Sequence, residues 1–143
     1  MAYESVKRIT GKPVILPYKC TNATATEFYA GDLVKLDGSG TIVVATTGAI
    51  LGIACSDNPA DATKTVDVDI ITPNGDLFEM KKATVNAVSD KGEIHTVTFT
   101  ASAHTVADGS TDFIALATVG VVGTGYFLQG MFKYSSLQAV TGF

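Results

Sequence analysis

The fold is decided by residues 30–80, which read AGDLVKLDGSGTIVVATTGAILGIACSDNPADATKTVDVDIITPNGDLFEM. This stretch consists of short β-type runs separated by Gly, Asp and Asn. TVDVDI (65–70) alternates strictly between polar and apolar residues, and AILGIAC (49–55) is apolar almost throughout. PNGD (73–76) is a strong turn signal. We therefore expect short strands joined by tight turns, and we recognise no catalytic group in this stretch.

The composition of the whole chain favours the same class. Thr, Val and Ile together supply 43 of the 143 residues, whereas Leu, Glu and Gln supply 14. β-branched side chains fit a pleated sheet and lose rotamer freedom in helices. We therefore expect an all-β (mostly β) protein, a small barrel or sandwich of short antiparallel strands. Its length is typical of one domain, which we place at residues 18–143.

Charge and hydropathy narrow the classes of partner. The net charge of −4 argues against nucleic acid, because phosphate binding needs clustered Lys and Arg. No run approaches the roughly 18 apolar residues of a membrane span, so we expect no membrane partner. Apolar residues nevertheless make up 46% of the chain, and the mean hydropathy is +0.28. This excess predicts that sister subunits or a larger assembly cover part of the surface.

Residues 1–17 are expected to form an N-terminal arm and extended segment. The first dozen residues have no apolar period, and PVILPY (13–18) is bracketed by Pro13 and Pro17. Proline confines such a run to a sheet edge or an extended segment. The arm also has no apolar core of signal-peptide length. We therefore expect synthesis in a reducing cytosol, with free and mostly buried thiols at Cys20 and Cys55.

The remaining elements follow from periodicity and turn residues. A short helix starting near Ser110, Thr111 or Asp112 is an alternative to the beginning of the strand at 113–123. GVVGTG (120–125) lacks the Lys of a phosphate loop, which favours a strand-to-strand turn with a bulge. Strands are expected at 26–36, 41–45, 49–55, 64–71, 76–80, 83–88, 93–100, 113–123 and 126–134.

The sequence predicts no metal or cofactor site. Cys20 and Cys55 form no CxxC motif and have no paired His at metal spacing. Asp67 and Asp69 share one face of a strand and could bind Ca²⁺ or act as paired carboxylates. The ordered spacing of a calcium loop is missing, however, so we interpret them as a solvated strand face.

The two histidines give no catalytic signature. His95 is in phase with Val97 and Phe99, which predicts a hydrogen-bonded packing residue. His104 lies in a polar stretch with no Ser, Cys or Asp partner at motif spacing. The chain also has no G-x-S-x-G elbow. We therefore expect a protein that is not an enzyme.

GDLVKLDG (31–38), TIVVATTGAILGIACSDNP (41–59) and VDVDIITPNGDLFEM (66–80) together resemble the head decoration (capsid cement) proteins of tailed bacteriophages. The resemblance covers residues 26–80 well and the rest loosely, and residues 125–143 are compatible with the closing strands of such a protein. It implies a non-enzymatic homotrimer, or sometimes a dimer, on the outer surface of an expanded capsid. The partner would be the major capsid protein, and the protein would be made in the host cytoplasm.

The resemblance also implies an N-terminal segment that adds a strand to the capsid protein. Residues 1–13 suit that role because they are unpatterned and precede a Pro-bounded run. The symmetry axis and copy number stay open. The residues we assign to this capsid-binding arm are Tyr3, Val6, Arg8, Ile9 and Pro13.

Residues 126–134, YFLQGMFKY, predict a surface between subunits. Alternation puts Leu128 and Phe132 on one face and Phe127 and Met131 on the other. Because both faces carry large apolar groups, one should pack on the protein's own core and the other on a neighbour. We assign Phe127, Met131 and Val121 to this interface.

Two alternative functions share the β bias. A phage tail or host-surface β module would bind carbohydrate or a receptor, but the chain has no Trp to stack on a sugar. A head-completion or tail-tube structural protein is the other alternative.

Overall fold

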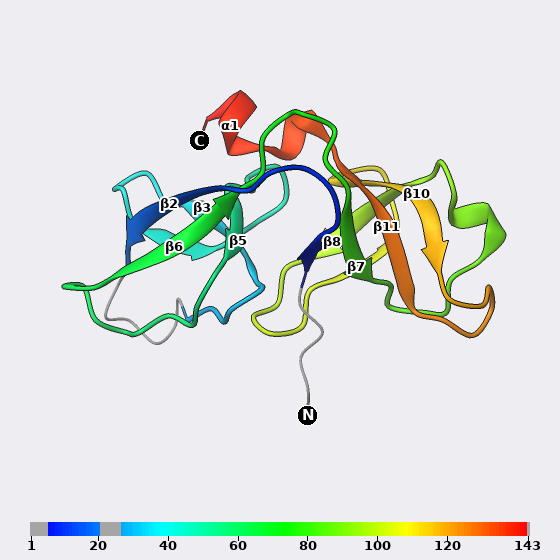
Figure 1. Cartoon of the computed structure of the whole chain (residues 1–143), viewed down its shortest axis with the longest axis horizontal. Helices are drawn as coiled ribbons and strands as arrows, with labels where there is room; N and C mark the ends of the chain where they lie inside the picture. Colours follow the sequence, from blue (N-terminus) through cyan, green and yellow to red (C-terminus); the bar gives the residue numbers. More distant parts are fainter. Residues whose placement is uncertain (1–5, 21–26, 143) are drawn as a thin grey trace.

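The structure, a computed structural model, describes residues 6–20 and 27–142. Within these residues the strands form two antiparallel sheets, which confirms the all-β class (Figure 1). The five-stranded sheet lies on the left of Figure 1 and the six-stranded sheet on the right. Residues 71–77 connect them along the chain, and the N-terminal segment crosses from one sheet to the other.

The six-stranded sheet has the order β1-β7-β11-β10-β8-β9. The long pair at its centre is β10 with β11, whose register shifts at a bulge between Ala115 and Ala117. The bounds are β1 (Lys7–Arg8), β7 (Phe78–Lys81), β8 (Ile94–Thr98), β9 (Thr105–Asp108), β10 (Phe113–Val119) and β11 (Phe127–Phe132).

The five-stranded sheet has the order β2-β6-β5-β3-β4, so β2 is an edge strand, as the two prolines predict. β6 contains the alternating run TVDVDI: Val66, Val68 and Ile70 are buried, and the two Asp residues lie on the other face. The bounds are β2 (Val14–Lys19), β3 (Leu33–Leu36), β4 (Ile42–Val44), β5 (Gly52–Ala54) and β6 (Thr65–Ile70).

Among the described strands, neither sheet closes into a barrel. A single bridge between Lys19 and Thr41 brings β2 near the start of β4. A similar bridge between Lys82 and Val106 brings the end of β7 to β9. The arrangement therefore matches the sandwich alternative rather than the barrel.

Two hydrophobic cores hold the sheets. The larger one is shared between them, because Leu33 and Ile53 of the five-stranded sheet pack in one cluster with residues of the six-stranded sheet. At its centre the Phe132 ring meets the rings of Phe78 and Phe113 edge-on, with both pairs of centroids 5.3 Å apart. The smaller core lies on the other face of the five-stranded sheet, around Phe28, Val34 and Val68.

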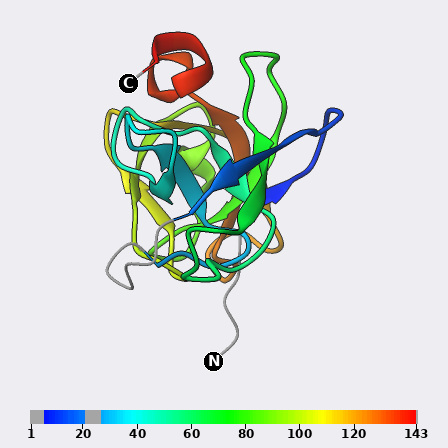
Figure 2. The ribbon, with the colours of Figure 1, turned by 90° about the vertical axis from the view of Figure 1, so that its left-hand side faces the viewer.

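The C-terminal segment connects the two sheets through hydrogen bonds. It leaves β11 through η3 (Tyr134–Ser136) and ends in α1 (Gln138–Thr141), at the upper end of the molecule in Figure 2. The Ile50 amide donates to the Ser136 carbonyl, and the Gln138 amide donates to the Ile50 carbonyl, both at 2.8 Å. The Gln138 side chain also bonds both backbone groups of Leu36 in β3.

Several predicted elements need correction. The expected strand at 83–88 is a loop that leads into η2 (Val88–Asp90), whereas β9 lies between the expected strands at 93–100 and 113–123, where no strand was predicted. The alternative helix near Ser110 is wrong, because β10 begins at Phe113. The expected bulge lies inside β10 and not in the turn at 120–125.

The described part of the N-terminal arm belongs to the sheets. β1 pairs with β7, and β2 pairs with β6 along its whole length. The expectation that the first dozen residues form no strand of the core is therefore wrong for residues 7–8. Residues 14–19 form the edge strand that the two prolines predict, and Tyr3 lies outside the described residues. The expected capsid-binding role of the arm stays a prediction.

Candidate interaction surface

The outer face of the six-stranded sheet is the side whose residues stay partly exposed. Ile114 lies opposite Met131 on one neighbouring strand and opposite Ile94 on the other, and directly opposed residues share a face. Toward β7 the same face carries Gln129 opposite Glu79. All five side chains are half-buried. This face is therefore apolar over β8 and β10 and becomes polar toward β7.

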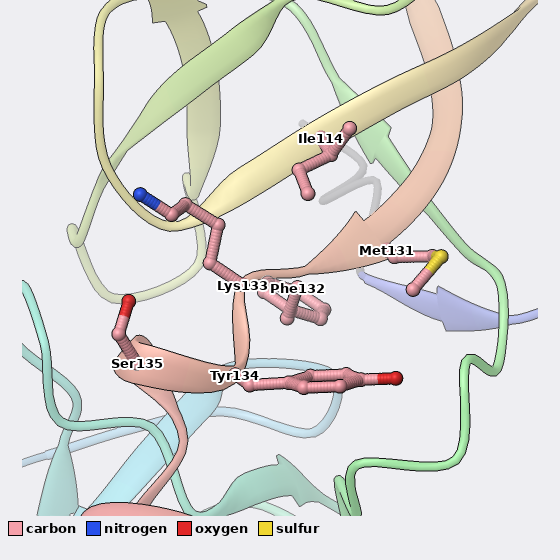
Figure 3. Close-up of a pocket in the computed structure, with 6 residues that line it drawn as sticks. All are labelled: Ile114, Met131, Phe132, Lys133, Tyr134 and Ser135. Atoms are coloured by element: carbon pink, nitrogen blue, oxygen red, sulfur yellow. The ribbon is translucent and has the colours of Figure 1, made fainter.

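A hollow of about 410 Å³ opens on this face (Figure 3). The Tyr134 ring forms its floor in the view of Figure 3, Met131 lies at one side, and Ile114 projects from the neighbouring strand. Lys133 points away from Met131 and Tyr134. A hollow with these walls can accept an apolar side chain from a partner. Its lining consists of Ile114, Met131, Phe132, Lys133, Tyr134 and Ser135.

The alternation expected along 126–134 is present. Leu128 and Phe132 are buried in the shared core, whereas Phe127 and Met131 are half-buried on the outer face. Phe127 and Met131 therefore lie on one face, as the sequence indicated. Whether a neighbour covers that face stays a prediction.

Val121 lies apart from the other two predicted interface residues. It is 71% exposed in the turn between β10 and β11. The buried Asn86 holds this turn: its side-chain amide donates to the carbonyls of Val119 and Phe127, at 3.0 and 3.2 Å. The Gly123 amide in turn donates to the Asn86 carbonyl at 3.0 Å. Val121 therefore belongs to a loop surface at the end of the sheet.

A second apolar surface lies on β2. Val14, Ile15 and Leu16 are 47%, 50% and 47% exposed, although they are consecutive aliphatic residues of a strand. Their register opposite β6 places Val14 and Leu16 on the face of the smaller core and Ile15 on the face of Asp69. Alternation would bury one of these faces in a central strand. Because β2 lies at the edge, both faces stay accessible.

The structure separates the predicted arm residues into two groups. Ile9 and Pro13 are exposed, whereas Val6 is buried in the shared core. The Arg8 guanidinium bonds both oxygens of Asp69, at 2.7 and 2.9 Å, and one oxygen of Asp76 at 2.6 Å. It also lies 4.9 Å from the centre of the Phe78 ring. The Asp69 hydrogen bond is the main reason that the pKa of Arg8 is raised above its usual value.

Arg8→Met should lower the free energy of unfolding by roughly 1.5–3 kcal/mol, the usual contribution of hydrogen bonds to charged groups. The variant leaves two partly buried carboxylates without their cation. Denaturant titration measures the effect, with Lys12→Met as the control because Lys12 is an exposed cation in the same segment. Equal stability of Arg8→Met and the wild type would show that residues 7–8 are a free arm after all.

A buried polar cluster lies at the end of the six-stranded sheet. The Lys82 ammonium contacts Asp90 Oδ1 at 2.8 Å and Oδ2 at 3.0 Å, and the Ala87 amide donates to Oδ2 at 2.7 Å. His95 Nε2 lies 3.3 Å from Asp90 Oδ1. Burial alone would raise the pKa of Asp90, but the bonds from Lys82 and Ala87 outweigh it and lower that pKa. Asp90 is therefore ionised at neutral pH.

Both histidines are buried, and His95 occupies the position that its phase predicts. His95 is fully buried in β8. His104 is also buried, and its Nδ1 accepts a hydrogen bond from the Thr100 amide at 3.1 Å while Nε2 faces the Leu33 carbonyl. Burial is the main cause that lowers the pKa of His104, so the ring is neutral at pH 7. His104 lies in a loop just before β9, as expected, but its side chain is buried there.

Two fully buried carboxylates hold loops together. Asp32 accepts hydrogen bonds from the amides of Tyr29 and Ser102, at 2.9 and 3.0 Å. Asp112, whose φ is 80°, accepts the Ser136 hydroxyl at 2.9 Å and the Gly48 amide at 3.3 Å. Buried carboxylates need such donors, because an unpaired charge in the interior is costly. Both arrangements connect segments that are distant in the sequence.

The Asp67–Asp69 candidate is only partly a solvated face. Asp67 is exposed as expected, but Asp69 is paired with Arg8. Among the described residues, these two carboxylates belong to no cluster with metal-ligand spacing. Cys20 and Cys55 are free, as expected; Cys20 is buried, whereas Cys55 is exposed and corrects the expectation for that thiol.

The charged members of the buried cluster, Lys82 and Asp90, were not predicted, although the sequence contains one signal for them. Phe78, Met80 and Lys82 are in phase, and the first two are core residues. A lysine at a core position predicts a buried carboxylate, since a charge is rarely buried without a partner. The identity of that carboxylate, Asp90, depends on the loop that returns through η2 and has no periodic signal.

No protein-family model matches this sequence, and no curated protein matches it as a relative. Within residues 6–20 and 27–142, no helix has the length and apolar character that a membrane crossing requires.

Proposed function

We propose that this chain is a non-enzymatic structural protein that binds the outer surface of a viral capsid. There it stabilises the shell by cross-linking neighbouring major capsid subunits. The observation that carries the proposal is the presence of two separate exposed apolar surfaces. One is formed by Val14, Ile15 and Leu16 on β2, and the other surrounds the hollow beside Met131. A protein that cross-links needs at least two such surfaces.

The β2 surface takes the role that was expected of a free arm. Residues 14–19 already pair with β6, so they contact the capsid protein through side chains and the free edge of β2. Pro17 lacks an amide hydrogen and interrupts the donors of this strand. The contact therefore relies mainly on Val14, Ile15 and Leu16. This mode differs from the addition of a disordered arm as a new strand.

The outer face of the six-stranded sheet is the surface for self-association as a trimer or dimer. Burial of one aliphatic or aromatic side chain contributes roughly 1.5–3 kcal/mol, so a few such contacts suffice for a weak interface. A trimer that touches several capsid chains at once gains strength through effective concentration. The net charge of −4 suits the outside of the shell, away from the packaged genome.

The buried titratable groups support a structural role. Asp32 and Asp112 accept hydrogen bonds from backbone amides, and His104 is bonded on both sides by backbone groups. These bonds fix loops to the sheets and orient no group toward the hollow beside Met131. We therefore propose that the chain acts by binding and not by catalysis.

Co-sedimentation tests the proposal. Purified protein is mixed with expanded, DNA-free capsids of the cognate major capsid protein, with unexpanded procapsids, and with insoluble polysaccharide. We expect saturable binding to the expanded capsids and an increase in their thermal stability. Binding only to the polysaccharide would identify a carbohydrate-binding tail or host-surface module. Failure to bind expanded capsids at micromolar concentration would overturn the proposal.

A further inference from the structure

The buried cluster at the end of the six-stranded sheet contains three potential metal ligands. Asp90 ends η2, His95 lies in β8, and Asp108 ends β9 directly opposite His95. Their ligand atoms all lie within 4.8 Å of one another. His95 lies 5 positions after Asp90 and 13 positions before Asp108, so no local sequence motif predicts the cluster. The pairing of β8 with β9 brings them together.

The hydrogen bonding of His95 directs one ring nitrogen into this cluster. Nδ1 lies 3.2 Å from the Glu93 carbonyl oxygen, and a hydrogen bond between them requires the ring proton on Nδ1. In the neutral ring Nε2 then carries a lone pair, and it points between Asp90 Oδ1 and Asp108 Oδ1. Both neighbours are acceptors, and His95 is fully buried. With the proton on Nδ1, the Nε2 lone pair and the two carboxylate oxygens converge on one point, as the ligands of a metal ion do.

The distances from Nε2 to the two carboxylates favour a metal ion over direct hydrogen bonds. Nε2 lies 3.3 Å from Asp90 Oδ1 and 3.5 Å from Asp108 Oδ1. Charge-assisted N–H···O bonds are shorter, about 2.7–2.9 Å. Zinc binds nitrogen and oxygen at about 2.0–2.2 Å, and tetrahedral geometry then separates two ligands by roughly 3.3–3.6 Å. These two separations match edges of such a tetrahedron, and the third pair of ligand atoms lies within 4.8 Å.

The surroundings also suit a bound ion. The Asp108 side chain is 76% exposed, which leaves an entry path and room for a water as the fourth ligand. The Glu93 carbonyl holds His95 as outer partners commonly hold metal-bound histidines. Lys82 contacts Asp90 Oδ1 at 2.8 Å, and each carboxylate oxygen has two lone pairs, so Oδ1 can contact both Lys82 and an ion. Two carboxylates and one ammonium leave one negative charge for the ion to balance.

We propose that Asp90, His95 and Asp108 form a binding site for one divalent zinc ion. The ion connects the edge strand β9 to β8 and η2, and so stabilises this end of the six-stranded sheet. The site is independent of capsid binding, because Met131 and β2 belong to other surfaces. Failure of either proposal therefore leaves the other unaffected.

Isothermal titration of the metal-free protein with Zn²⁺ near neutral pH tests the site. We expect one ion per wild-type chain and a rise in Tm, since a ligand that binds the folded state stabilises it. Asp108→Asn should weaken binding at least tenfold without changing the Tm of the metal-free protein, because this side chain is exposed. Asp67→Asn is the matched control: it makes the same substitution at an exposed carboxylate of the other sheet and should bind Zn²⁺ as the wild type does.

Two results would overturn the proposal. If the wild type binds no Zn²⁺ at concentrations up to a millimolar, the three side chains form a hydrogen-bonded cluster and no metal site. If Asp108→Asn binds as tightly as the wild type, the ion lies elsewhere, for example at the exposed Cys55. A Cys55→Ser variant that loses binding would confirm that second outcome.

Discussion

Lys82→Met will lower the free energy of unfolding by about 3–5 kcal/mol, the cost of removing one partner of a buried ion pair. Methionine nearly preserves the length and packing of the lysine stem, so the lost free energy of unfolding measures the contribution of the ammonium group. Without that group the Asp90 carboxylate keeps only two partners, the Ala87 amide and, at 3.3 Å, Nε2 of His95, although Asp90 is almost fully buried. Urea titration followed by circular dichroism measures the change.

Lys91→Met is the matched control, because Lys91 follows Asp90 in the chain but is exposed. Its stability should differ from that of the wild type by less than about 0.5 kcal/mol. If both lysine variants were equally stable, the pair between Lys82 and Asp90 would contribute nothing. The buried cluster would then not hold η2 to the sheet.

The pH dependence gives an independent check on this pair. The pKa of Asp90 lies below its usual value of 3.8 in the folded protein. Its contribution to stability is therefore complete above pH 3.8 and is lost as the pH falls through the folded-state pKa. In Lys82→Met, protonation of Asp90 removes the unpaired buried charge. The difference in the free energy of unfolding between Lys82→Met and the wild type should consequently become smaller in acid. A constant difference from pH 7 to pH 3 would contradict this account.

Local patterns in the sequence were sufficient for much of the fold. The alternation in TVDVDI predicted β6 and its buried valines, and the prolines around PVILPY predicted an edge strand. Both signals act within a few residues, because period-2 alternation and the missing proline amide are properties of the strand itself. The faces of residues 126–134 were predictable for the same reason.

Elements that depend on distant partners were not predictable. The residues of β9 have no alternation of their own, and this strand forms because it pairs with β8 and meets Lys82 at Val106. Arg8 lies in an unpatterned segment, yet its position is fixed by Asp69 and Asp76, more than 60 residues away. The cluster around His95 likewise requires η2 and β9 to converge. Such contacts are specified by tertiary structure and leave no periodic trace.

Met131→Asp should weaken self-association roughly tenfold to a hundredfold while the monomer remains folded. Met131 is half-buried beside the hollow on the outer face, whereas its strand neighbours Leu128 and Phe132 fill the core. Burial of an apolar side chain at an interface contributes roughly 1.5–3 kcal/mol, and a buried charge adds a desolvation cost. The variant should therefore lose the interface and keep the fold.

Sedimentation velocity over a range of concentrations measures the association, and circular dichroism confirms the folded state. Val140→Asp is the control, since it adds the same charge at an exposed apolar residue of α1, away from the outer face. An unfolded Met131→Asp would show that Met131 is a core residue. If Met131→Asp associates as the wild type does, the interface lies elsewhere, and Val121 in its exposed turn is the next residue to substitute. If Met131→Asp loses self-association and Val140→Asp does not, a neighbouring subunit must cover Met131. A charge on a face open to water costs little, so it would not weaken association by itself.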